Sequence, residues 1–150
     1  MNLATESLLA LYTRDLDKLA EELRLYPSEV AVWNVSTGIT NSAGNLCLHL
    51  CGNLQHFIGA VLGSSWYIRN REAEFSSRDI PRATLLAEIE QTKASLTHAL
   101  SFLAHDQLHA QYPIDVFGKP MTTLYFLMHL ASHLGYHLGQ VNYHRRLVRK

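Results

Sequence analysis

The sequence contains little of what several classes of protein require. Its 150 residues include only two cysteines, Cys47 and Cys51, which is too few for a disulfide scaffold. Lysine and arginine together number 13, as do aspartate and glutamate, so the chain lacks the basic excess typical of nucleic-acid-binding proteins. No apolar run approaches the roughly 20 residues that span a bilayer. These absences predict neither a nucleic-acid partner nor a membrane partner.

The N-terminal segment also lacks a targeting signal. Residues 1–18 carry neither a basic flank nor a small-residue cleavage site, so they do not resemble a signal peptide, and we expect a cytoplasmic protein. The composition, with 47% hydrophobic and 17% charged residues, is typical of a globular protein. A chain of 150 residues is typical of one domain, so we expect a single domain over residues 1–150.

Helical periodicity dominates the chain, and strand patterns are nearly absent. Apolar residues recur every three or four positions with charged residues between them. These stripes predict long helices over residues 5–25, from 42 or 45 to 66 or 70, over 81–105, and from 121–123 to 148, with a short helix at 28–33. Residues 69–80 and 106–120 are expected to be irregular. Four long helices, with connections long enough to cross over an end, predict an all-α four-helix bundle.

The two cysteines flank a histidine in the second long helix. Cys47 and Cys51 lie one turn apart, with His49 between them. A Cys-x-His-x-Cys metal site is one interpretation, but residues two apart on a helix point to different sides. Free cysteine commonly behaves as a small buried apolar residue, so we expect buried thiols.

Histidines gather on one face of the last helix. His129, His133 and His137 recur every four residues, roughly one helical turn, so they lie one above another. The second long helix carries His49 and His56, seven residues apart and also on one face. Packing gives no reason to place several imidazoles on one face of a helix, whereas imidazole is the commonest metal ligand in proteins. We therefore expect a histidine-lined metal site inside the bundle.

Three other polar residues share these faces, and the best-known catalytic metal motifs are absent. The polar residues are Asn53 in the second long helix, and Tyr136 and Gln140 in the last. Residue 134 is leucine, so the His-Glu-x-x-His motif of metalloproteases is missing. No glutamate is followed three residues later by histidine, the pattern of di-iron bundles. The residues alone therefore predict a metal site without identifying its reaction.

Two segments resemble those of a known superfamily. "HLGYHLGQVNYHRRL", residues 133–147, resembles the His-x-x-x-His-x-Gly-Gln signature of the DinB-like superfamily of four-helix proteins, which includes the YfiT-like group and thiol S-transferases. "LCLHLCGNLQHFIG", residues 46–59, resembles the segment that supplies the first histidine ligand of that superfamily. The resemblance covers essentially the whole chain, although only these two segments are specific. It implies a DinB/YfiT-like bundle with long crossover connections.

The resemblance also implies a set of metal ligands. His49, His133 and His137 correspond to the three histidines that hold a nickel or zinc ion, with water completing its shell. Two alternatives remain. His56 replaces His49 in one, and His129 replaces a member of the pair His133 and His137 in the other. Gln140 matches the glutamine that follows the pair, whereas Leu138 stands where many members carry arginine.

The function implied is that of a metal-dependent enzyme, a thiol S-transferase or a hydrolase. The ion would activate a bound water or a low-molecular-weight thiol such as bacillithiol or mycothiol. Asn53, Tyr136 and Gln140 would orient the ligands or contact the substrate. No acidic general base is evident near the three histidines, which favours thiol activation over peptide hydrolysis.

Two other interpretations remain open at this point. In one, the metal stabilises a non-catalytic bundle that acts through a partner or as a homodimer, and we expect a homodimer. In the other, a haem lies between His49 and His133, since helical bundles can offer two axial ligands.

Overall fold

The computed structural model describes residues 1–148 and is helical throughout, with no strand in this range. Its elements are α1 (Leu3–Leu25), α2 (Glu29–Trp33), α3 (Ala43–Leu54), the π-helix η1 (Gln55–Ala60), α4 (Arg71–Ser76), α5 (Arg82–Ser101), α6 (His105–His109) and α7 (Thr123–Leu147). The prediction of an all-α protein is confirmed. None of the helices in residues 1–148 is both long enough and apolar enough to cross a bilayer.

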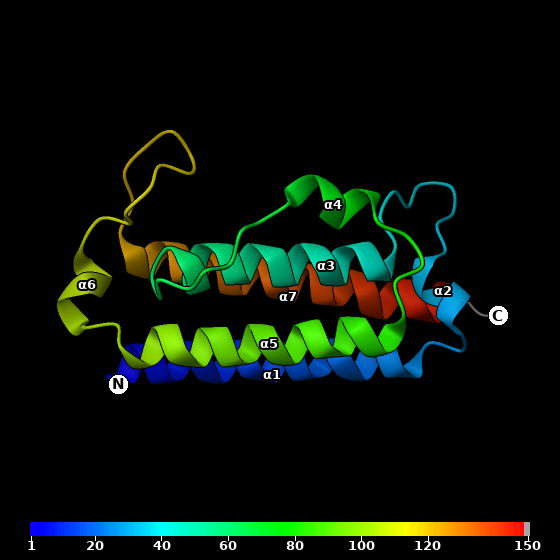
Figure 1. The fold of residues 1–150 in the computed structure, drawn as a ribbon, viewed down its shortest axis with the longest axis horizontal. Helices are drawn as coiled ribbons and strands as arrows, with labels where there is room; N and C mark the ends of the chain where they lie inside the picture. The colour runs from blue at the N-terminus through cyan, green and yellow to red at the C-terminus, as the bar shows by residue number, and fades with distance from the viewer. Residues whose placement is uncertain (149–150) are drawn as a thin grey trace.

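The four long helices form a bundle (Figure 1). α1 packs against α5 and α7, and α3 packs against the same two helices from the other side. α1 and α7 run in one direction, whereas α3 and α5 run in the other (Figure 1). Because α3 and α5 are parallel, residues 61–81 must return along the length of the bundle, and they carry α4 over α3 (Figure 1). The predicted bundle with long crossover connections is therefore confirmed.

Polar side chains set where the helices begin. Ser42 accepts a hydrogen bond from the backbone N–H of Asn45 at the start of α3, and Thr122 accepts one from Tyr125 at the start of α7. Ser28 caps α2 in the same way, by accepting from the N–H of Ala31. The first and last helices begin and end close to the predicted residues.

The second long helix ends earlier than predicted. Its α-helical pattern stops at Leu54, a π-helical turn continues to Ala60, and Ser64 has a φ of 55° that ends the helix. α5 packs closely against this segment, since a Cβ at Gly59 would overlap the hydroxyl of Ser95 on α5. Gly63 makes a second close contact with α5, at Ala99.

Both segments predicted to be irregular contain a short helix, and the third long helix ends at Ser101 instead of residue 105. α6 lies in the second of these segments. In the first, Asn70 caps α4 by accepting from the N–H of Ala73. The amide of Asn45 in α3 also donates to the backbone carbonyls of Glu74 and Ser77, which fixes the end of α4 on the bundle.

The core fills the space between the long helices and includes two buried tyrosines, Tyr12 in α1 and Tyr26 directly after it. Tyr12 donates a hydrogen bond to the carbonyl of Leu127. Tyr26 contacts Nδ1 of His144 at 2.6 Å, and Nε2 of the same ring lies 2.7 Å from the carbonyl oxygen of Asn34. His144 is thus a buried structural residue that ties the end of α7 to the ends of α1 and α2.

Candidate metal centre

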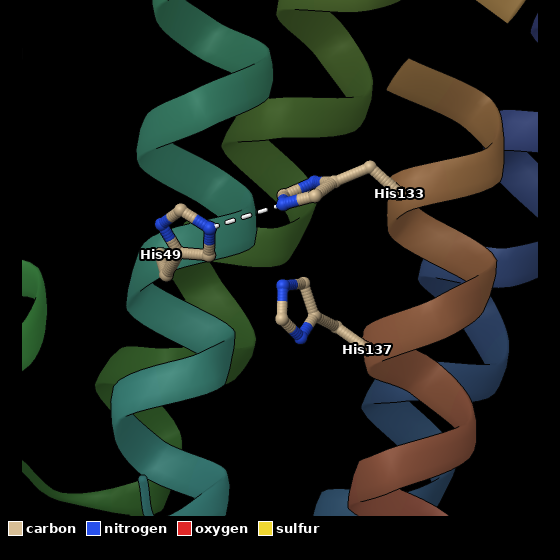
Figure 2. A group of neighbouring side chains, drawn as sticks. All are labelled: His49, His133 and His137. Carbon is tan, nitrogen blue, oxygen red and sulfur yellow. Dashed lines mark hydrogen bonds between the residues drawn. The ribbon is translucent and has the colours of Figure 1, made fainter. Parts of the chain in front are cut away.

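Three histidines from two helices meet in the interior of the bundle (Figure 2). His49 comes from α3, and His133 and His137 come from α7. One ring nitrogen from each lies within 4.8 Å of the others, and Nε2 of His49 lies 3.2 Å from Nε2 of His133. No second group of three histidine, cysteine or acidic side chains is as close within residues 1–148. The three imidazoles form a candidate metal site.

The convergence follows from the packing of α3 against α7. The four-residue spacing places His133 and His137 one turn apart on one face of α7, and α3 lies against that helix. Nitrogens that bind a tetrahedral ion at about 2.1 Å are separated from one another by roughly 3.4 Å. The 3.2 Å between the Nε2 atoms of His49 and His133 is already close to that separation.

A buried ion pair holds the outer nitrogen of His49. Nδ1 of His49 donates to Oε1 of Glu74 at 3.1 Å. Arg69 donates twice to the same carboxylate, from Nε to Oε2 and from Nη2 to Oε1, each at 2.9 Å. Nη2 of Arg69, which can only donate, also lies 3.4 Å from Nδ1 of His49, but the contact with Glu74 is shorter, and an ionised carboxylate can only accept. Glu74 therefore favours the proton of His49 on Nδ1. The lone pair of Nε2 therefore faces the other two histidines.

Glu74 reaches His49 because α3 carries a glycine at the point of contact. A Cβ at Gly52 would overlap Oε2 of Glu74, so a side chain there would displace the carboxylate. Burial acts to raise the pKa of Glu74, but the hydrogen bonds from His49 and Arg69 outweigh it and hold that pKa below its ordinary value. Glu74 is therefore ionised at neutral pH.

The sequence does not reveal this carboxylate. Residues 69–80 were expected to be irregular, which is wrong for α4. No acidic general base was expected near the three histidines, and Glu74 is an acidic residue that contacts His49 in another role. The sequence offers no signal for the contact, because Glu74 and His49 are 25 residues apart and α4 is too short for a periodic pattern. Glu74 lies on the Nδ1 side of His49, however, and is not placed to accept a proton from a molecule bound at Nε2.

The outer nitrogen of His137 also has a partner. Nδ1 of His137 lies 2.6 Å from Oε1 of Gln140, one turn further along α7. An amide oxygen can only accept, so Nδ1 of His137 donates, and its Nε2 is left for the interior. Tyr136 lies beside this pair at the surface, 66% exposed, with its ring centre 5.3 Å from that of His137.

The two histidines that α7 contributes to the candidate site, His133 and His137, are neutral at pH 7. Burial, followed by the neighbouring His137 and His49, lowers the pKa of His133 to about 4. Burial also lowers the pKa of His137, although its hydrogen bond to Gln140 acts in the opposite direction. Metal ions bind the neutral form of imidazole, so protons compete weakly for this site near neutral pH.

Asn53 lies one turn beyond His49 on α3 and is 7% exposed. Its Oδ1 is buried and has no hydrogen-bond partner, and the same is true of Nδ1 of His133. Within residues 1–148, these are the two buried side-chain atoms without a partner. Both belong to residues of the candidate site or next to it.

The alternative histidines lie outside the cluster. His56 is in η1, with its ring centre 4.8 Å from that of Phe57. His129 is exposed, and its ring packs against Phe117 and Phe126. Neither belongs to the group of three.

Two other interpretations of the sequence are resolved by the structure. Cys47 and Cys51 are buried free thiols, as expected, and neither joins the histidine cluster. A haem does not fit between His49 and His133, because 3.2 Å between the Nε2 atoms leaves no room for a macrocycle. The ring of His137 also lies beside both, with its centre 5.3 Å and 4.5 Å from theirs, so the haem interpretation is wrong.

Comparisons with known proteins agree with the fold. The crystal structure of a DinB-like protein from Bacillus cereus ATCC 10987 superposes with a TM-score of 0.73 at 18% sequence identity, covering 94% of this chain and 90% of that chain. A comparison with curated proteins gives no match. The family model described as "Protein of unknown function (DUF1572)" matches residues 10–150. The chain therefore belongs to the DUF1572 family, and its fold is that of a DinB-like protein.

Proposed function

We propose that the chain binds a divalent metal ion, nickel or zinc, through His49, His133 and His137. The observation that carries the proposal is the pair of Nε2 atoms 3.2 Å apart, one of them on a ring whose proton is committed to Glu74. Two nitrogen lone pairs at that distance repel each other unless a proton or a cation lies between them. Without a metal, neutral His133 supplies that proton by carrying it on Nε2, and a divalent cation replaces it when it binds both nitrogens. The lowered pKa keeps His133 in the neutral form that a cation binds.

The donor set fits a catalytic ion better than a closed structural one. Structural zinc sites have four protein ligands, whereas catalytic sites have three and keep a position for water or substrate. Three neutral imidazoles leave the full double charge on the ion. When bound, the ion would lower the pKa of a coordinated thiol or water and so supply a nucleophile near neutral pH.

We further propose that the chain is an enzyme, and that thiol S-transfer fits the site better than hydrolysis. Attack by water benefits from a general base on the open side of the ion, but Glu74 lies behind His49 with both oxygens occupied by Arg69. A thiol is more acidic than water and needs less help to ionise. In this proposal Gln140 orients His137, and the exposed Tyr136 contacts the low-molecular-weight thiol or its electrophile.

Substitution with cobalt tests the proposal, because Co²⁺ reports its ligands through its absorption spectrum. Addition of 2-mercaptoethanol to the cobalt-loaded chain should produce a sulfur-to-cobalt charge-transfer band, and His133→Ala should abolish the band. The loaded protein should also accelerate the reaction of the same thiol with an electrophile such as monochlorobimane. A spectrum that no thiol changes would favour a purely structural ion.

One observation favours the second candidate, a bundle that acts as a homodimer. The outer face of α7 exposes a row of large apolar and aromatic side chains, each more than half exposed: Tyr125, Met128, Tyr136, Tyr143 and Leu147. Their spacing follows one face of the helix over nearly its whole length. Rows of this kind commonly mark interaction surfaces. We propose that two copies of the chain pair along this face.

Sedimentation of the wild type and of Tyr125→Glu and Tyr143→Glu variants tests the pairing. A dimer that dissociates in the variants while metal content is retained supports the pairing. A monomeric wild type at micromolar concentration contradicts it.

A further inference from the structure

Two complementary polar atoms lack partners at the candidate metal centre. Oδ1 of Asn53 is a hydrogen-bond acceptor, and Nδ1 of His133 is a donor whenever Nε2 carries the lone pair. A buried polar atom without a partner costs about 1–3 kcal/mol, so such atoms are rare and call for an explanation. Within residues 1–148 they occur only at these two positions, on facing helices.

The other two histidines show what His133 lacks. The outer nitrogen of His49 donates to Glu74, and that of His137 donates to Gln140. Metal-binding imidazoles almost always donate their outer N–H to such an acceptor, which fixes the tautomer and the orientation of the ring. His133 is therefore the one member of the group with no side chain assigned to this role.

The antiparallel packing of α3 and α7 places Asn53 on the correct side. Asn53 lies one turn beyond His49 toward the end of α3, a step of about 6 Å along the helix. Because α7 runs in the opposite direction, this step leads away from His137. Figure 2 shows that the second ring nitrogen of His133 lies on the side of the ring that faces away from His137.

We propose that Oδ1 of Asn53 is the acceptor that orients His133, through one bridging water. The two atoms do not form a direct hydrogen bond in the structure. A water that accepts from Nδ1 of His133 and donates to Oδ1 of Asn53 satisfies both atoms, and two polar partners are enough to hold a buried water. Asn53 is then a positioning residue. It keeps the proton of His133 on Nδ1 and so keeps the Nε2 lone pair directed at the ion. This inference rests on the proposed metal site.

The Nδ1–H proton of His133 in the zinc-loaded protein gives a readout that does not depend on activity. Long-range proton–nitrogen NMR spectra assign this proton to its ring nitrogen, and its exchange rate with solvent reports whether it is hydrogen-bonded in the interior. We expect a slowly exchanging Nδ1–H of His133 in the wild type. In Asn53→Leu, which keeps the volume and removes the acceptor, we expect this proton to exchange faster. Asn53→Asp keeps the oxygen and should restore slow exchange.

Zinc affinity, measured by competition with a chromophoric chelator, gives the second readout. Loss of an acceptor of this kind typically weakens metal binding 10- to 100-fold, and we expect a loss of this size in Asn53→Leu. Thr92→Val is the matched control, because it removes a buried hydroxyl that donates to the carbonyl of Glu88 on α5. The control should bind zinc as the wild type does.

Three results would overturn the inference. The first is an Nδ1–H of His133 that exchanges rapidly in the zinc-loaded wild type. The second is an unchanged exchange rate of this proton and an unchanged zinc affinity in Asn53→Leu. The third is an unchanged affinity combined with a raised KM for the thiol, which would make Asn53 a substrate contact. A wild type that binds no zinc would instead refute the proposed function, and this inference with it.

Discussion

The substitution Glu74→Gln probes the link between the crossover segment and the metal site. Glutamine keeps the size of the side chain and one acceptor oxygen but removes the charge. Arg69 loses its two charge-assisted bonds to the carboxylate, and the amide presents donors where only acceptors are tolerated. Nδ1 of His49 then has no obligatory acceptor, so its proton can move to Nε2 and block the nitrogen that faces the ion.

The structure gives a magnitude for each effect. Breaking a buried ion pair by neutralising one partner costs about 3–5 kcal/mol. Arg69 is only 12% exposed, which supports this range, but glutamine retains one acceptor, so we expect the lower end, about 3 kcal/mol. Loss of the partner of His49 should weaken metal binding about 10- to 100-fold, which corresponds to about 1.4–2.7 kcal/mol.

Glu72→Gln is the matched control, because Glu72 lies in the same helix, loses the same charge and is exposed. Urea unfolding of the metal-free proteins measures the first effect, and zinc competition under native conditions measures the second. Glu72→Gln should resemble the wild type in both assays. If Glu74→Gln bound zinc as tightly as Glu72→Gln, the carboxylate would have no part in holding His49, and the reasoning would be refuted.

Three further predictions concern the same site. His133→Ala should lose most of its bound metal but keep its helical circular dichroism, because the apolar core does not depend on this ring; unchanged metal content by elemental analysis would contradict the assignment. Gly52→Ala should displace Glu74 and weaken zinc binding about tenfold, whereas Gly118→Ala, which strains only an exposed loop where φ is 78°, should leave zinc binding unchanged. Metal-free wild type should lose stability as the pH falls from about 6.5 to 4, because the pKa of His133 in the fold is about 4 and the unfolded chain binds the proton first. We expect a loss of about 1–2 kcal/mol for this partly exposed ring, and His133→Ala should lack it in urea unfolding at each pH.

Much of the fold could be predicted because it depends on local patterns. α1 and α7 carry long apolar stripes and side-chain caps, and both appear nearly where the sequence places them. The end of α3 could not be predicted in this way. Its π-helical turn packs against α5 through Gly59 and Ser95, a contact between residues far apart in the sequence that no local pattern reveals. α4 was missed for a similar reason, since Asn45 of α3 fixes it from outside.

The same holds for the candidate site: its local features could be predicted from the sequence, and its long-range contacts could not. The pairing of His133 with His137 follows from their spacing on one helix. Spacing alone could not choose between His49 and His56, which share a helix face, and the resemblance to the DinB-like superfamily made that choice. The roles of Glu74 and Arg69 could not be predicted, because the contact of Glu74 with His49 exists only after the crossover segment folds over α3.

Anomalous X-ray scattering at the zinc edge, from crystals of the untagged protein grown with zinc, tests the central claim most directly. We predict one strong peak about 2.1 Å from a ring nitrogen of each of His49, His133 and His137. A map with no peak among these three rings, although zinc is bound elsewhere on the protein, would contradict it.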